Sequence, residues 1–166
     1  MPQKTAKRKI TKRKIPKLPI ILVAVLALII AAFCVWQICI PHPMRMSETV
    51  YGSNEQIDLT ADEYNQLTQD KASFIVFIDQ TNCITANKLR EMLGHIADEH
   101  QIHIYHIMWA DISDTNLREK VKYYPSVAII QNGQVVDALD ANADAHTAYY
   151  NSEADLKDWL SRYVEL

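Results

Sequence analysis

Cys83 is the residue whose type and position are best suited to covalent chemistry. It follows a polar stretch at positions 79–82 and stands at the predicted start of a helix. The unpaired backbone N–H groups at a helix N-terminus carry a partial positive charge, which stabilises a thiolate. As a thiolate, Cys83 would attack a disulfide in a substrate and form a mixed disulfide with it.

Ala86 occupies the position one helical turn after Cys83. In enzymes that use two cysteines, the second cysteine stands there and displaces the substrate. An alanine cannot do this, so exchange at Cys83 stops at the mixed disulfide unless an external thiol resolves it. This argues against net reductase or oxidase turnover and leaves exchange through a single thiol open. The alternative for Cys83 is a structural role, because free cysteine is among the most buried residue types.

Two groups of residues contain side chains that can bind metal ions, but their spacing does not suit a metal site. Histidine recurs at every third position over residues 100–106, but on a strand, side chains three apart point to opposite faces. The aspartates of 137–144 lack the alternating spacing and the closing glutamate of a calcium loop. The sequence has no zinc pattern, phosphate-binding glycine loop or serine nucleophile motif. We therefore predict neither a metal site nor a cofactor.

Helices and strands are predicted to alternate around Cys83. Phe74–Ile78 is a run of five apolar residues, which is typical of a strand buried on both faces of a sheet. Ile102–Trp109 is rich in β-branched and aromatic residues and predicts a second strand. Asn132-Gly133 lies between two apolar runs and is a strong hairpin signal.

The predicted order is helix, strand, helix, strand, helix, strand, strand, helix. Thr60 with Glu63 predicts a capping box at the first helix, and Ser152 with Asp155 predicts one at the last. Two crossover units followed by a hairpin predict an α/β fold, with a mixed four-stranded sheet and helices on both faces.

Charge is divided sharply along the chain. Eight of the seventeen basic residues and no acidic residue precede position 20, whereas residues 41–166 hold nine basic and twenty acidic residues, a net charge of −11. Between these parts, residues 19–40 carry no charge. At about 1.5 Å per residue, this run covers the roughly 30 Å hydrocarbon core of a bilayer. We therefore predict one transmembrane helix at 19–40, in contact with membrane lipid.

The basic cluster also predicts the orientation of this span. Lysine and arginine favour the cytoplasmic side, so the C-terminal part lies outside the cell membrane. The predicted parts are a basic cytoplasmic stub at 1–18, the single-pass helix at 19–40, a linker at 41–56 and a domain at 57–166. The span accounts for the basic residues, so we do not expect nucleic-acid binding. The alternative is a cleaved signal peptide, but the apolar run exceeds the usual length of about 7 to 15 residues.

Several motifs, in their order and spacing, resemble the thioredoxin family. The strand at 74–78 leads through a short polar turn to Cys83 at a helix start, where the family has its CxxC motif. Later, Tyr124-Pro125-Ser126 places a proline before a strand, which is similar to the family's cis-proline facing the cysteine. The hairpin at 132–133 and the closing helix are also similar, and the resemblance covers 57–166. It implies a thioredoxin-like fold with Tyr124, Pro125 and Ser126 along a substrate groove.

The departures from the family pattern fall on its redox residues. The chain has Cys83-Ile84-Thr85-Ala86 where the family has C-G-P-C, so the second cysteine and the intervening proline are missing. The family's buried acidic residue, six positions before the first cysteine, corresponds to Phe77. The tryptophan before that cysteine corresponds to Asn82. The features of the scaffold are retained.

These observations leave open two interpretations of function and add a third hypothesis. In the first, the domain is a binding or accessory module for secreted or envelope proteins, without full dithiol redox turnover. In the second, Cys83 is a monothiol in thiol–disulfide exchange or an isomerase-like reaction, which the disulfide-permissive exterior allows. The layout also resembles accessory proteins for bacteriocin transport, which gives the third hypothesis.

Overall fold

The apolar run predicted as a buried strand lies at the centre of the sheet. In the computed structural model, which describes residues 26–30 and 43–166, this strand is β2 (Phe74–Asp79), and all six of its residues are buried. It pairs in parallel with β3 (Ile104–Met108) and antiparallel with β4 (Ser126–Gln131). A strand with neighbours on both edges and helices on both faces has no exposed side, which explains the unbroken apolar run.

The sheet has five strands in the order β1-β3-β2-β4-β5, so the prediction of four strands is wrong. The additional strand is β1 (Gln56–Asp58), which pairs in parallel with β3. It holds one apolar residue, Ile57, so neither an apolar run nor an alternating pattern marks it in the sequence. The predicted mixed character of the sheet is confirmed, because β5 (Gln134–Ala138) forms the antiparallel hairpin with β4.

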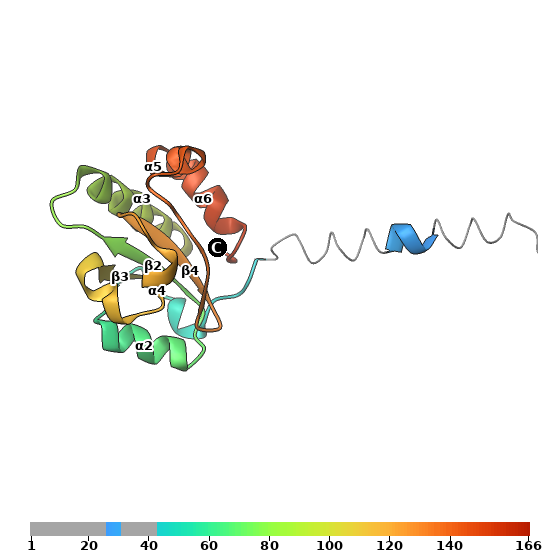
Figure 1. Cartoon of the computed structure of the whole chain (residues 1–166), viewed down its shortest axis with the longest axis horizontal. Coiled ribbons are helices and arrows are strands. Elements are labelled where there is room, and N and C mark those ends of the chain that lie inside the picture. The colour runs from blue at the N-terminus through green and yellow to red at the C-terminus, as the bar shows by residue number, and fades with distance from the viewer. Residues whose placement is uncertain (1–25, 31–42) are drawn as a thin grey trace, which may run out of the picture. The chain divides into compact units, whose positions relative to one another are not determined.

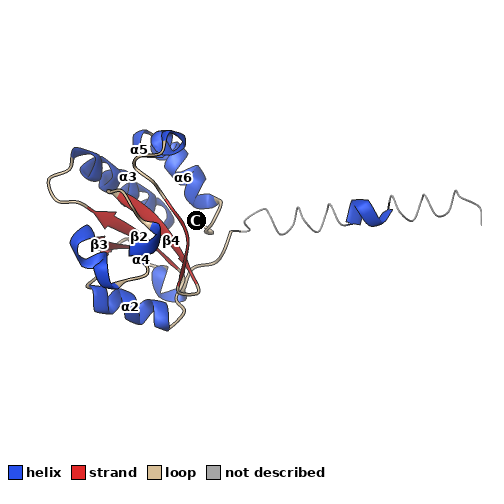
Figure 2. Ribbon diagram, viewed as in Figure 1, coloured by secondary structure: helices blue, strands red, loops and turns tan. Residues whose placement is uncertain are grey.

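Helices cover both faces of this sheet (Figures 1 and 2). Tyr64 packs edge-on against Phe74, whereas the Arg90 guanidinium lies over the Phe77 ring. Phe74 and Phe77 point to opposite faces of β2. The helices that carry Tyr64 and Arg90 therefore cover opposite faces of the sheet. The helices are α2 (Ala61–Gln69), α3 (Ile84–His100), α4 (Leu117–Lys120), α5 (Thr147–Asn151) and α6 (Glu153–Ser161). Short 3-10 helices occupy Glu48–Val50, Trp109–Asp114 and Asp144–His146.

Residues of the stretch predicted as a linker also pack on this domain. Met46 and Val50 are buried in its core. The Val50 carbonyl accepts a hydrogen bond from the His103 backbone N–H at 2.7 Å, and the Met44 backbone N–H donates to the Tyr163 carbonyl at 2.7 Å. The chain before β1 is therefore attached to both β3 and the C-terminal segment.

Side-chain caps fix the starts of two helices. At α2, Thr60 Oγ1 accepts from the Glu63 backbone N–H, and the Glu63 carboxylate accepts from the Thr60 backbone N–H at 2.8 Å, which confirms the capping box. At α6, Ser152 Oγ accepts from the Asp155 backbone N–H at 3.2 Å, but the Ser152 backbone N–H donates to the Ala148 carbonyl, so the predicted second capping box is only half formed.

The predicted stub at 1–18 and most of the predicted membrane helix at 19–40 lie outside the described residues. Residues 26–30 of that stretch are helical. Within 26–30 and 43–166, no helix combines the length and the apolar character that a membrane span requires.

Gly133 in the β4–β5 hairpin gives a direct test of this packing. Asn132 and Gly133 both have positive φ, as a two-residue hairpin turn requires. A Cβ on Gly133 would overlap the Thr68 carbonyl oxygen at the end of α2. We expect Gly133→Ala to lower the free energy of unfolding by about 1 to 3 kcal/mol, measured by urea denaturation of the 166-residue chain.

Gly94→Ala is the matched control. Gly94 lies inside α3, and a Cβ there would have only an ordinary contact with Gln56 Nε2, at 3.8 Å. This change should raise the free energy of unfolding by up to about 1 kcal/mol, because alanine favours a helix over glycine. Equal effects of the two substitutions would contradict the turn geometry.

Candidate functional site

Cys83 is placed by the junction between β2 and α3. β2 ends at Asp79, and three residues later the chain turns at Asn82, whose φ of 59° is a left-handed conformation that asparagine tolerates. Cys83 is the N-cap of α3, and its carbonyl accepts from the Asn87 backbone N–H at 3.1 Å. The first turn of α3 contains no acidic residue. The helix therefore presents its positive end to the Cys83 sulfur.

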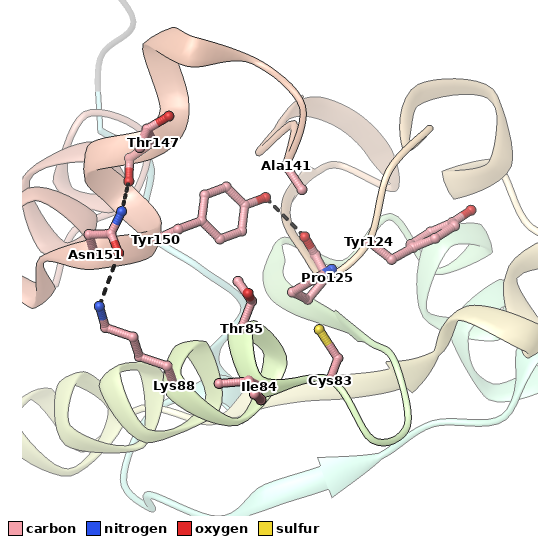
Figure 3. A pocket seen from close by; sticks show the side chains of 10 residues that line it. All are labelled: Cys83, Ile84, Thr85, Lys88, Tyr124, Pro125, Ala141, Thr147, Tyr150 and Asn151. Atoms are coloured by element: carbon pink, nitrogen blue, oxygen red, sulfur yellow. Dashed lines mark hydrogen bonds between the residues drawn. The ribbon is translucent and has the colours of Figure 1, made fainter.

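A pocket of about 510 Å³ opens beside Cys83 (Figure 3). Cys83 is half-buried rather than fully enclosed, and its sulfur points toward Pro125. A structural role as a fully buried apolar residue does not fit this exposure. Three elements line the pocket: the start of α3, the loop before β4 and the segment around α5. The lining residues are Cys83, Ile84, Thr85, Lys88, Tyr124, Pro125, Ala141, Thr147, Tyr150 and Asn151.

The structure brings together three of the four residues predicted for the site. Cys83, Tyr124 and Pro125 line the same pocket, and the Tyr124–Pro125 peptide bond is cis. Ser126 does not line it. Its side chain is fully buried at the start of β4, where its hydroxyl donates to the Leu139 carbonyl at 2.6 Å. Ser126 therefore joins β4 to the end of the hairpin rather than contacting a ligand in this pocket.

The wall opposite α3 is formed by the segment that includes α5. The buried Tyr150 hydroxyl donates to the Pro125 carbonyl at 2.9 Å. Burial, with a smaller contribution from Asp140, raises the pKa of Tyr150, so the phenol keeps the proton that it donates. Lys88 Nζ donates to Asn151 Oδ1 at 3.1 Å across the pocket. Sequence reasoning missed this wall, because α5 has five residues and shows no helical period.

The comparisons with known proteins concern the fold alone. No protein-family model matches the sequence, and no curated protein matches it significantly. Solved thioredoxins do match the structure. The chain has a thioredoxin-like fold. A mutant thioredoxin from Halobacterium salinarum is 17% identical with a TM-score of 0.54, over 69% of this chain and 96% of that one. Thioredoxin from Schistosoma mansoni is 17% identical with a TM-score of 0.51, over 68% of this chain and 100% of that one.

Apolar side chains surround the pocket of this thioredoxin-like domain. Ile84, next to Cys83, is 87% exposed, and Trp109 is 46% exposed. The rings of Trp109 and Tyr124 lie 5.8 Å apart between centroids. Exposed large apolar residues that gather around a pocket are typical of a surface that contacts another molecule.

A charged network lies at the end of β2, four residues before Cys83. Asp79 is 2% exposed and accepts hydrogen bonds from the Gln80 backbone N–H at 2.6 Å, from His106 Nε2 at 2.9 Å and from the Arg90 guanidinium. Burial alone would raise the pKa of Asp79, but the hydrogen bonds from His106 and Arg90 outweigh it and lower that pKa. Asp79 therefore ties β2 to β3 and α3.

Sequence reasoning assigned Asp79 to a polar turn and overlooked its burial. The position of Asp79 directly after an apolar run, at the carboxyl end of a central strand, could have indicated its burial. His106 also contacts Asp58 on β1 through Nδ1, so both ring nitrogens face carboxylates. Among the described residues, no group of histidine, cysteine, aspartate and glutamate side chains is arranged to hold a metal ion.

The arrangement places one cysteine sulfur at the edge of a pocket. Ala86, one turn along α3, is fully buried, and Cys83 is the only cysteine between residues 43 and 166. Nothing in this part of the chain would displace a partner bound to the Cys83 sulfur.

Replacing the buried Asp79 carboxylate tests the network beneath the site. We expect Asp79→Asn to lower the free energy of unfolding at neutral pH by about 3 kcal/mol, because Arg90 and His106 lose their shared anion. The folded state lowers the pKa of Asp79, so its stabilisation is complete above about pH 4 and is lost as the pH falls through the lowered value. Urea denaturation at a series of pH values measures this difference.

The exposed Asp111→Asn provides the control and should leave the free energy of unfolding nearly unchanged. The difference between the unsubstituted chain and Asp79→Asn should narrow only in the acidic range. A difference of constant size down to low pH would show that Asp79 is not ionised in the folded state.

Proposed function

We propose that this thioredoxin-like domain binds cysteine-containing proteins by covalent capture, through a mixed disulfide at Cys83. The observation that carries the proposal is the position of the Cys83 sulfur. It faces a pocket beside Pro125, while the position that would hold a second thiol is the buried Ala86. The site therefore combines access for a partner with no internal means of release.

The proposed step conserves atoms and electrons. The Cys83 thiolate attacks one sulfur of a partner disulfide, a new S–S bond forms between Cys83 and that sulfur, and the other partner sulfur leaves as a thiolate. No net oxidation occurs. Release requires a second thiolate, from the partner or from a small thiol, which attacks the mixed disulfide and returns Cys83 to its thiol form.

The sequence also supports a location for this activity. We propose that residues 19–40 anchor the chain in the cell membrane and that the domain lies on the outer side, where partner proteins form disulfides. Support comes from the uncharged apolar run and from the eight basic residues that precede it. In this setting the partners would be secreted or envelope proteins.

A second candidate function is binding without covalent capture. The exposed Ile84 and Trp109, with the Tyr124 ring next to that of Trp109, would supply apolar contact area near the pocket. A role as an accessory protein in bacteriocin transport belongs to this second candidate. The two functions differ in whether partner binding requires the Cys83 sulfur.

Acid trapping of cells, followed by electrophoresis without reductant, tests covalent capture. We expect the chain with Cys34→Ser and Cys39→Ser to form high-mass adducts that reductant dissolves. Cys83→Ser should remove them without loss of folding, because Cys83 lies at a partly exposed helix start. Partner binding that persists in Cys83→Ser, with no adduct trapped by the chain that retains Cys83, would favour the non-covalent function.

Ala86→Cys supplies the second thiol that the site lacks and is the counterpart of Cys83→Ser. Residues three apart on the first turn of a helix are neighbours, so the introduced thiol would displace a partner from Cys83 and form an internal disulfide with it. We expect the trapped adducts to decrease several-fold and insulin reduction by the chain with dithiothreitol to rise above that of the unsubstituted chain. Efficient insulin reduction by the unsubstituted chain would contradict the proposal.

Alkaline extraction of membranes tests the proposed anchor. We expect the 166-residue chain to stay with the membrane pellet, because an apolar span of this length is held by lipid rather than by surface charge. A version lacking residues 1–40 should appear in the supernatant. Release of the unsubstituted chain by alkali would contradict anchoring.

A further inference from the structure

The charge of the pocket differs from the charge of the domain around it. Residues 41–166 carry a net charge of −11, but the pocket lining contains no acidic residue and one basic residue, Lys88. Asp140 adjoins the lining residue Ala141 in the sequence, and its side chain accepts a hydrogen bond from the Asn142 backbone N–H at 2.8 Å. The pocket is thus a local cationic site on an acidic domain.

Lys88 differs from the basic residues that the domain uses for its own ion pairs. Within residues 43–166, four basic side chains form ion pairs with carboxylates: Arg45, Arg90, Lys157 and Arg162. Lys88 instead donates to the neutral amide oxygen of Asn151. This bond orients the ammonium group over the pocket without neutralising its charge.

The spacing between Cys83 and Lys88 suits an extended polypeptide. The two residues are five positions apart at the start of α3, which corresponds to about 7 to 8 Å along the helix axis. An extended chain advances about 3.3 Å per residue, so an acidic side chain two or three positions from a partner cysteine would reach Lys88.

The wall around α5 limits the size of the group that can enter the pocket. A cavity of about 510 Å³ admits a few side chains rather than a folded surface. Tyr150, fixed to the Pro125 carbonyl, closes the side of the pocket opposite α3.

We infer that the partner captured by Cys83 is a polypeptide that carries an aspartate or glutamate two or three residues from its reactive cysteine, and that Lys88 binds this carboxylate. The inference rests on the proposed function and specifies the partner. Lys88 is a specificity residue in this account. It takes no part in the exchange of sulfur atoms.

Peptides that carry a pyridyl disulfide on their single cysteine test this inference. Three peptides differ only in having aspartate, asparagine or lysine two residues from the cysteine. Attack by Cys83 releases thiopyridone, whose absorbance reports the rate, and the leaving group is the same for all three. The 166-residue chain is used with Cys34→Ser and Cys39→Ser, so that Cys83 is the only thiol.

We expect the aspartate peptide to react about three to ten times faster than the lysine peptide at low ionic strength, with asparagine between them. Lys88→Met should remove most of this preference, and added salt should reduce it. Lys71→Met is the control, because Lys71 precedes β2 at the end of the strand remote from Cys83.

Failure of the proposed function and failure of the inference about the partner give different results in this experiment. If no peptide reacts while a small neutral disulfide probe also fails, the proposed function is wrong. If all three peptides react at one rate, or if Lys88→Met leaves the preference intact, covalent capture stands and the inference about the partner is overturned.

Discussion

The buried strand β2, held at its end by Asp79, determines where Cys83 lies. The Asp79 carboxylate receives hydrogen bonds from β3 through His106 and from α3 through Arg90. A buried carboxylate is stable only when such partners compensate for its lost hydration. These contacts connect the end of β2 to β3 and to the middle of α3. Cys83 follows four residues later, at the positive end of the helix and beside Pro125.

In the function that we propose, the Cys83 sulfur is accessible to a partner, and residues 43–166 contain no second thiol that would release it. Cys83 opens onto a pocket that Tyr150 and Asn151 wall on the far side, while Ala86 is fully buried where a second thiol would stand. A single sulfur would favour lasting attachment over turnover. In the proposed account of the partner, the positive charge of Lys88 would select among the polypeptides that Cys83 captures.

Much of the fold could be predicted from patterns that local physics enforces. The unbroken apolar run of β2, the Asn132-Gly133 turn and the Thr60 capping box each impose one local structure, and each is found. β1 was missed because three residues with one apolar side chain carry no period. The α5 wall and the burial of Asp79 were missed because they depend on contacts between residues far apart in sequence, such as that between Tyr150 and Pro125.

The lifetime of a defined mixed disulfide shows whether Cys83 holds a partner that nothing else in the domain releases. The purified chain, with Cys34→Ser and Cys39→Ser, would be joined through Cys83 to a cysteine peptide, and its intact mass followed over hours without any external thiol. We predict that the adduct persists in full and that added thiol releases the peptide and regenerates free Cys83. Spontaneous release of the peptide without added thiol would contradict it.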